Sequence, residues 1–154
     1  LDMGAPAFLV SSTLMLIVAQ RLVRKICPNC ISSYTLDKKT VAELEQHFHM
    51  KEIIDVMARE KAIASAKETL ASMLFYRGNG CGECHKDGYK GRVGIYEVLE
   101  VSPAMAELIL RHPTREELFV QAKKDGMITL AQEGFMKAKN GITTIEELIR
   151  VTKE

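Results

Sequence analysis

Apolar residues at helical spacing mark the segment between residues 51 and 72. Most successive members of an apolar set lie three or four positions apart, and Ala, Glu and Lys are frequent between them: Ile53, Ile54, Met57, Ile63, Ala66 and Leu70. This spacing predicts a helix over 51–72. Ser65 and Glu68 have the spacing of a second helix start, so we expect a break near Ser65.

A shorter helix and an extended segment flank this stretch. Thr40 and Glu43 have the spacing of a capping box, which predicts a helix running to about His47. Residues 73–77 are apolar and aromatic without helical periodicity, which favours an extended segment.

The N-terminal run from Ala5 to Ala19 is apolar almost throughout. Pro6 suits the first turn of a helix, so we predict a helix over 6–17. The run is short for a membrane span and contains two serines and a threonine, and no basic segment precedes it as in a signal peptide. A buried helix is therefore the favoured interpretation. Residues 20–26 are ambiguous between a helix end and a strand.

The last third of the chain shows a strand followed by four helix starts. Residues 92–101 are β-branched and aromatic, which predicts a strand. Helices are predicted after Ser102-Pro103, from the capping box that begins at Thr114, over 129–139, and from the box at 144–147. We therefore expect a mainly α protein with a small β element (α+β), in which residues 102–154 form a helical bundle.

Composition narrows the class of protein only moderately. The chain has 154 residues, 47% of them apolar and 27% charged, with a formal net charge of +1. These values suit about one soluble globular domain without a general attraction to nucleic acid or membranes. The chain lacks tryptophan, so a base-stacking platform is not evident. Because the sequence begins with Leu in mid-pattern, we interpret it as a fragment of a longer protein.

The four cysteines carry the clearest chemical signal. They are arranged as two C-x-x-C pairs, Cys27 with Cys30 and Cys81 with Cys84. Such spacing lets a tight turn direct two thiolates at one ion, and two pairs supply the four ligands of a closed tetrahedral zinc site. A closed site has no open position for substrate, so its role would be structural. Glycines at 82, 88 and 91 suit the turns of such a site, where positive φ and close backbone approach are needed.

Other uses of these cysteines remain open at the level of sequence. An iron–sulfur cluster could use all four, and an exported protein could pair them in disulfides. Cys81, Cys84 and His85 also match the C-x-x-C-H pattern of covalent haem attachment, which would leave the first pair unexplained. A redox-active dithiol is the remaining alternative, although the β-α-β pattern of thioredoxin-like proteins is absent.

The remaining polar residues give weaker indications of function than the cysteines. The chain contains no Gly-Lys dipeptide and therefore no phosphate-binding P-loop. His47, His49, His85 and His112 have no metal-ligand spacing of their own, so surface or capping roles are expected. Six basic residues flank the cysteine pairs and could form a patch for phosphate or an acidic partner, or a solvated rim: Arg21, Arg24, Lys25, Lys86, Lys90 and Arg92.

Several blocks, taken in order, resemble one protein family. These are LDMG at 1–4, FLVSS at 8–12, AQRLVRK at 19–25 before the first cysteine pair, YRG at 76–78, GYKGRVGIYE at 88–97, and GITT at 141–144, with Glu147 and RVT at 150–152. Together they are similar to the C-terminal part of the type II secretion ATPases and the type IV pilus assembly ATPases. The resemblance spans almost the whole chain.

The resemblance implies a role for each part. Residues 1–26 would be the C-terminal end of a RecA-like motor domain, 27–101 a tetracysteine zinc-binding element with a helical insertion, and 102–154 a helical subdomain. Residues 51–72 are longer and more helical than the family pattern. The motor's own ATP- and Mg-binding motifs would lie upstream of residue 1, so this part is expected to be structural and non-catalytic.

The family also implies an assembly and a location. The parent would be a cytoplasmic homohexamer, peripheral to the bacterial inner membrane, that powers pilus assembly or protein export. Its partners would be adjacent subunits and an inner-membrane platform protein, with no nucleic acid and no membrane insertion expected. The alternative is a free-standing zinc domain that docks nucleic acid or a protein partner through the basic residues beside the cysteines.

Overall fold

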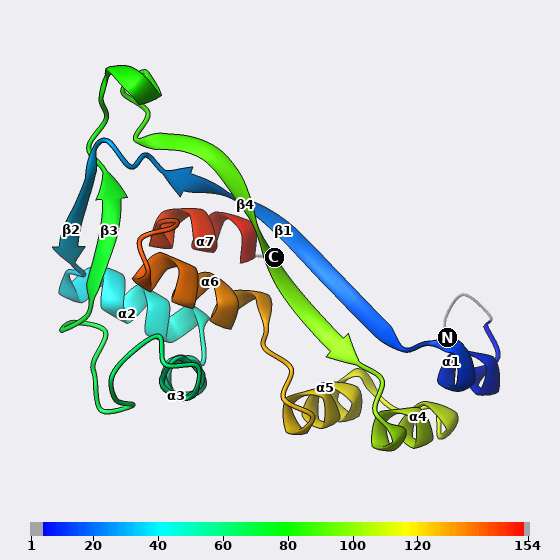
Figure 1. Ribbon diagram of the computed structural model, residues 1–154. Helices are drawn as coiled ribbons and strands as arrows, with labels where there is room; N and C mark the ends of the chain where they lie inside the picture. Colours follow the sequence, from blue (N-terminus) through cyan, green and yellow to red (C-terminus); the bar gives the residue numbers. More distant parts are fainter. Residues whose placement is uncertain (1–4, 153–154) are drawn as a thin grey trace. The chain divides into compact units, whose positions relative to one another are not determined.

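Two long strands, β1 (Leu16–Ile26) and β4 (Tyr89–Glu100), pair with each other and run through both parts of the chain (Figure 1). The computed structural model describes residues 5–152. Unit 1 comprises Leu1–Ala19 and Tyr96–Thr129, and unit 2 comprises Gln20–Ile95 and Leu130–Glu154. Helices and a small proportion of strand make up both units, which confirms the α+β prediction.

Unit 1 is the smaller unit and is built largely from short helices. Its helices are α1 (Ala7–Thr13), α4 (Pro103–Leu110) and α5 (Arg115–Lys124), with α4 contacting both of the others. Its buried cluster consists of Met105, Ile109 and Ala122. The predicted caps are present: the hydroxyl of Ser102 accepts a hydrogen bond from the Met105 amide at 3.1 Å, and Thr114 forms a reciprocal capping box with Glu117.

Unit 2 combines a second two-stranded sheet with four helices. Strand β2 (Ile31–Thr35) pairs antiparallel with β3 (Leu74–Gly78), so that Ile31 faces Gly78 and Thr35 faces Leu74. The helices are α2 (Lys38–His47), α3 (Met50–Arg59), α6 (Leu130–Lys139) and α7 (Ile145–Thr152), and a single 3₁₀ turn, η1 (Gly82–Cys84), precedes β4.

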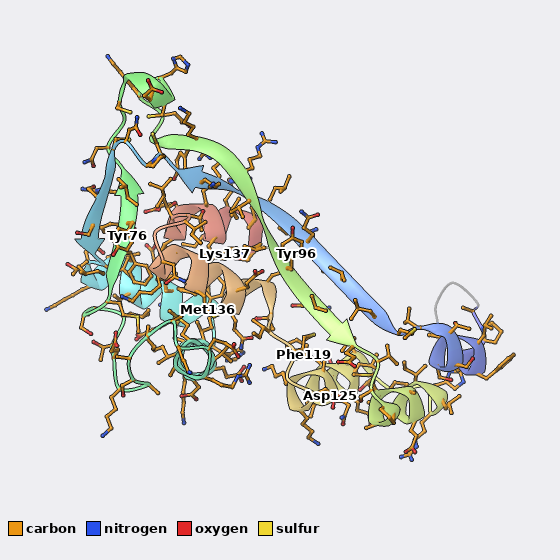
Figure 2. The ribbon with its side chains drawn as sticks, viewed as in Figure 1. Tyr76, Tyr96, Phe119, Asp125, Met136 and Lys137 are labelled. Atoms are coloured by element: carbon orange, nitrogen blue, oxygen red, sulfur yellow. The ribbon has the colours of Figure 1, made fainter. Side chains whose placement is uncertain are left out.

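Helix α6 is the centre of the unit 2 core. It contacts α3, α7 and β3, and its Phe135 meets Phe48 edge to face with ring centroids 5.5 Å apart. Met136, labelled on the same helix in Figure 2, packs against this core from its edge. Gly134 permits the close approach of α7, because a Cβ there would lie 2.2 Å from a methyl carbon of Leu148. The buried apolar residues of this core are Val23, Leu36, Leu44, Met50, Ile53, Met57, Ile63, Leu70, Met73, Phe75, Ile95, Phe135, Ala138, Ile145 and Leu148.

The predicted buried helix over 6–17 is wrong in length and in burial. Helix α1 ends at Thr13, none of its residues is buried, and β1 begins at Leu16. The ambiguous segment 20–26 belongs to this strand. Three hydroxyl side chains at the end of α1 donate hydrogen bonds to the carbonyls of Phe8 and Leu9, which compete with the backbone hydrogen bonds of the helix. A continuous apolar run does not distinguish a strand from a helix.

The predicted helix over 51–72 is also wrong beyond Arg59. Lys61 adopts a left-handed conformation with φ of 58°, and the Met57 carbonyl accepts hydrogen bonds from the amides of Ala62 and Ile63. This turn redirects the chain so that Ile63 and Leu70 enter the core through non-helical backbone. Ser65 and Glu68 make local turn hydrogen bonds and begin no helix.

Most of the other boundary predictions agree with the structure. Helix α2 ends at His47 as expected, but Asp37 is its N-cap and accepts from the Thr40 amide at 2.7 Å, so the predicted start at Thr40 is wrong. The extended segment near 73–77 is β3. The four helices expected after residue 102 all form, although α4 and α5 belong to unit 1 and α6 and α7 to unit 2. Within residues 5–152, no helix has the length and apolar character needed to cross a membrane.

Candidate metal centre

The four predicted cysteine ligands come together at one end of the β2–β3 pair. Cys27 follows β1, Cys30 directly precedes β2, Cys81 precedes the turn η1, and Cys84 is the last residue of this turn. Backbone hydrogen bonds fix the two pairs: the Cys27 amide donates to the Gly88 carbonyl at 2.9 Å, and the Asn79 amide donates to the Cys30 carbonyl at 2.9 Å. The chain between the pairs therefore leaves along β2 and returns along β3.

The sulfur atoms have the separations of a tetrahedral site. All four Sγ atoms lie within 4.8 Å of one another. Sγ of Cys81 lies 3.9 Å from that of Cys27 and 3.7 Å from that of Cys84, and Cys30 and Cys84 are 3.8 Å apart. Four sulfurs at a zinc–sulfur distance of about 2.3 Å would be about 3.8 Å apart. The arrangement fits zinc in spacing and in ligand chemistry.

The cysteines are free thiols in this structure, and no two of them are at bonding distance. A disulfide needs sulfurs about 2.05 Å apart. The structure also groups Cys81 and Cys84 with the other pair, whereas a haem site would use them together with His85 alone. Within residues 5–152, these four are the group of Cys, His, Asp and Glu side chains placed to share one metal ion.

Backbone amides stabilise negative charge on one of the sulfurs. The amides of Cys81 and Gly88 donate to Sγ of Cys84 at 3.2 and 3.3 Å. The hydrogen bond from the Cys81 amide is the main cause that lowers the pKa of Cys84 to about 6. Burial, in contrast, raises the pKa of Cys30 to about 12. Because four neighbouring thiolates repel one another, the cluster requires a cation to become fully deprotonated.

Glycines allow the backbone to close tightly around the cysteines. A Cβ on Gly78 would lie 2.0 Å from the Gly88 carbonyl oxygen, and Gly88 itself has φ of 80°. Only glycine fits this close approach. Gly91 also has positive φ, as expected, but Gly82 does not and would have open space around a Cβ. The expectation that Gly82 provides positive φ and a close backbone approach is therefore wrong.

A buried carboxylate near the metal centre was not found by sequence reasoning. Glu147 is 1% exposed and accepts five hydrogen bonds, three from Arg24 and two from Arg150, at 2.8–3.0 Å. Burial by itself raises the pKa of Glu147, but the hydrogen bonds from the two arginines outweigh it and lower the pKa to about 2. Arg24 also stacks on the Tyr89 ring at 4.0 Å, and the Tyr89 hydroxyl lies 3.0 Å from that of Thr144.

This network joins α7 to β1. The sequence offered one signal, the spacing from Thr144 to Glu147, which predicts a capping box. The Thr144 hydroxyl does cap the helix by accepting from the Glu147 amide at 3.2 Å. The Glu147 carboxylate instead reaches an arginine 123 positions away in sequence.

The remaining residues singled out in the sequence have varied surroundings. Arg24 and Arg92 line one hollow together with Arg150. Of the six basic residues flanking the cysteines, Arg24 is paired with Glu147, and Lys90 forms an ion pair with Glu83 at 3.0 Å. Nδ1 of His47 lies 2.8 Å from the Glu43 carbonyl within its own helix. These contacts support local structural roles.

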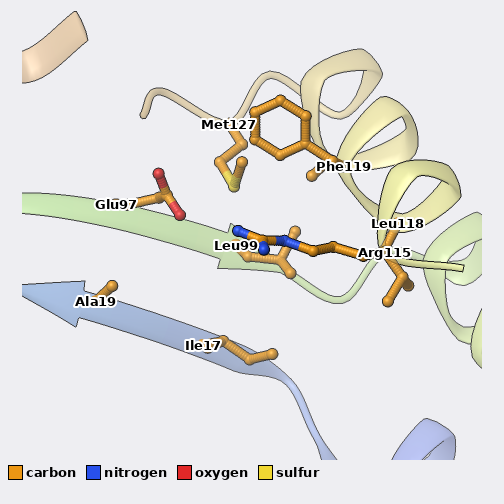
Figure 3. Close-up of a pocket in the computed structure, with 9 residues that line it drawn as sticks. Ile17, Ala19, Glu97, Leu99, Arg115, Leu118, Phe119 and Met127 are labelled. Atoms are coloured by element: carbon orange, nitrogen blue, oxygen red, sulfur yellow. The ribbon is translucent and has the colours of Figure 1, made fainter. Parts of the chain in front are cut away.

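Unit 1 contains a separate pocket of about 180 Å³. Figure 3 shows Phe119 and Met127 on the helical side of it and Ile17 and Leu99 on the strands opposite. The lining is mostly apolar and includes no cysteine or histidine. The chemically distinctive groups of this protein therefore lie in unit 2.

Comparisons with known proteins identify the family that this chain resembles. The family model described as "Type II/IV secretion system protein" matches residues 1–150. The chain is 36% identical over 154 residues to a type IV pilus assembly ATPase, PilB, of Pseudomonas aeruginosa, covering all of this chain and 24% of the relative. It is 35% identical over 153 residues to the type II secretion system protein E of the same species and to the type II secretion system ATPase E of Vibrio cholerae. In both of these, the match covers 99% of this chain and 26% of the relative. The chain thus spans about a quarter of the length of these relatives.

Proposed function

The chain belongs to the type II/IV secretion system protein family, and on that premise we propose that it is a structural, non-catalytic part of a secretion or pilus-assembly ATPase. Its Cys27, Cys30, Cys81 and Cys84 would hold one structural zinc ion. The observation that carries the proposal is the set of four sulfurs with the spacing of a zinc tetrahedron.

The zinc would act by joining segments that are distant in sequence. It would fasten the end of β1 to the start of β4 and close the excursion through α2 and α3. Closing a loop of about fifty residues restricts the unfolded chain, so the bound ion adds to the folding free energy of unit 2. Zinc has no redox chemistry, and four protein ligands leave no position for a substrate, which supports a structural role.

The catalytic work of the whole protein would lie outside this chain. The sequence has no P-loop lysine to contact nucleotide phosphates, and the structure contributes no carboxylate cluster suited to Mg²⁺ among residues 5–152. We propose that residues 1–26 belong to the end of a RecA-like motor domain, 27–101 to the zinc element and 102–154 to a helical subdomain, whose helices α6 and α7 pack in unit 2 with the zinc element. ATP and Mg²⁺ would bind elsewhere in the longer protein.

We also propose an assembly for the longer protein, based on the family to which its relatives belong. The parent would be a cytoplasmic homohexamer at the inner membrane, in which this part contacts neighbouring subunits or a platform protein. A rigid zinc-fastened unit suits the transmission of nucleotide-driven motion, since force passes through elements that do not deform.

Metal analysis combined with thiol counting tests the zinc proposal. We expect one zinc ion per chain and no reactive thiols until a chelator is added. After chelation, four thiols should react and the amides of residues 20–95 should exchange hydrogen faster. A metal-free protein with four reactive thiols and unchanged amide exchange would refute the structural zinc site.

Two variants distinguish a zinc site from other cysteine chemistry. Cys81→Ser should abolish stoichiometric zinc binding, while His85→Gln should leave it unchanged. A Soret band lost in both variants would indicate haem instead. ATP turnover by residues 1–154, with the same rate constant in independent preparations, would contradict the non-catalytic assignment.

A further inference from the structure

We propose that Arg24, Arg92 and Arg150 form a binding site for a phosphate group on unit 2. The three arginines come from β1, β4 and α7 and, together with Leu22, line an open hollow of about 450 Å³. Leu22 and Arg24 are two positions apart on a strand, so both side chains leave the same face. Nothing in the zinc proposal uses this hollow.

Glu147 holds two of the arginines in fixed positions. Its carboxylate accepts hydrogen bonds from Nε and Nη2 of Arg24 at 3.0 and 2.8 Å. It also accepts them from Nε and Nη2 of Arg150 at 2.9 and 2.8 Å. The Tyr89 ring supports the Arg24 guanidinium from one side. A ligand that binds here therefore needs to immobilise less side-chain freedom than on ordinary surface arginines.

Hydrogen-bond donors remain on all three arginines. Nη1 of Arg24 has only a long contact of 3.5 Å to Asp87, and Nη1 of Arg150 makes no hydrogen bond to the described residues. The Arg92 side chain is exposed and has no hydrogen bond or ion pair within residues 5–152. Each of the three guanidinium groups that line the hollow therefore has at least one donor that, among the described residues, is free or only weakly engaged.

The charge balance favours an anion. Three arginines contribute three positive charges, and the carboxylates of Glu147 and Asp87 remove two, which leaves one. Asp87 lies at the edge with 55% of its side chain exposed, so solvent screens its contact with Arg24. Guanidinium forks match phosphate, which offers up to four oxygens and carries between one and two negative charges at neutral pH. A single carboxylate has too few acceptors to engage three forks.

Binding to the complete 154-residue chain tests this site. Isothermal titration with inorganic phosphate, against potassium chloride at equal ionic strength, should give saturable 1:1 binding. Arg92→Gln should weaken the affinity about tenfold or more, because a charge-assisted hydrogen bond is lost while no internal contact changes. Arg111→Gln removes an equal charge from an exposed position in unit 1 and should leave the affinity unchanged.

A second titration identifies the source of the phosphate group. If ATP binds, Arg92→Gln weakens this binding and adenosine does not bind, the site exists and its phosphate group comes from a nucleotide. If inorganic phosphate binds and ATP does not, the site exists and its ligand is the free phosphate ion. Absence of saturable phosphate and ATP binding would overturn the proposal. So would an equal loss in the Arg92→Gln and Arg111→Gln proteins, or saturation by a polyglutamate peptide but not by phosphate.

Discussion

The two units differ sharply in how much of their apolar surface they bury. The main core of unit 2 contains fifteen buried apolar residues, whereas the cluster of unit 1 contains three among the described residues. Unit 1 instead leaves large apolar side chains exposed from α1 to the start of β1, including Phe8 at 67% in α1 and Met15 at 81% between the two elements. Unit 2 has the core of an independent folding unit, and unit 1 does not.

This difference has a functional meaning within the proposed assignment. Consecutive apolar residues of β1, Leu16, Ile17 and Val18, are exposed to 44–53%. Both faces of the strand are apolar, which is the pattern of a strand covered on both sides. The pattern supports the proposal that residues 1–26 belong to a larger motor domain, whereas unit 2 buries an apolar core of its own.

The sharpest test of the comparison replaces one aromatic residue in each unit. Phe135 is fully buried in α6, and Phe119 is 43% exposed in α5. Phe135→Ala should lower the free energy of unfolding of unit 2 by about 3–5 kcal/mol, because it leaves a cavity. Phe119→Ala should cost unit 1 less than about 1 kcal/mol. Hydrogen exchange resolved by segment measures both, and equal losses would contradict the comparison.

Acid should weaken unit 2 through Glu147. Its pKa is depressed to about 2 in the folded protein, against 4.5 ordinarily, so the folded state favours the ionised form. The corresponding stability, about 3 kcal/mol, is present above pH 4.5 and is lost as the pH falls toward 2. Glu147→Gln should remove this dependence, whereas Glu146→Gln on the same helix serves as the control. Stability curves from pH 6 to 2.5 that coincide for wild type and Glu147→Gln would exclude the effect.

A smaller effect is expected from the capping box of unit 1. Thr114→Ala removes the hydroxyl that accepts from the Glu117 amide at 3.3 Å and should cost about 1 kcal/mol. Because unit 1 has little core, the faster amide exchange should remain within α5 and its neighbours. Thr114→Ser retains the hydroxyl and should restore protection. Accelerated exchange in α6 would show that the two units unfold together.

Local sequence signals predicted the capped helices well. Ser102-Pro103, the Thr114 box and the glycines after α5 and α6 act within a few residues, so their effect does not depend on distant contacts. The metal-ligand pairs were readable for the same reason, because a C-x-x-C turn is local. The segment 51–72 failed because its helix-forming residues are overridden after Arg59, where burying Ile63 and Leu70 requires a turn.

The helix starts, the two cysteine pairs and the family were readable from the amino-acid sequence, since each depends on residue types at short or ordered spacings. The three-dimensional fold was needed to show that the four sulfurs of both pairs lie together, that the four late helices divide between two units, and that Glu147 binds Arg24 and Arg150. The contacts between the two cysteine pairs and between Arg24 and Glu147 join residues more than fifty positions apart in the sequence. Their formation depends on β2–β3 pairing and on core packing, which no local pattern encodes.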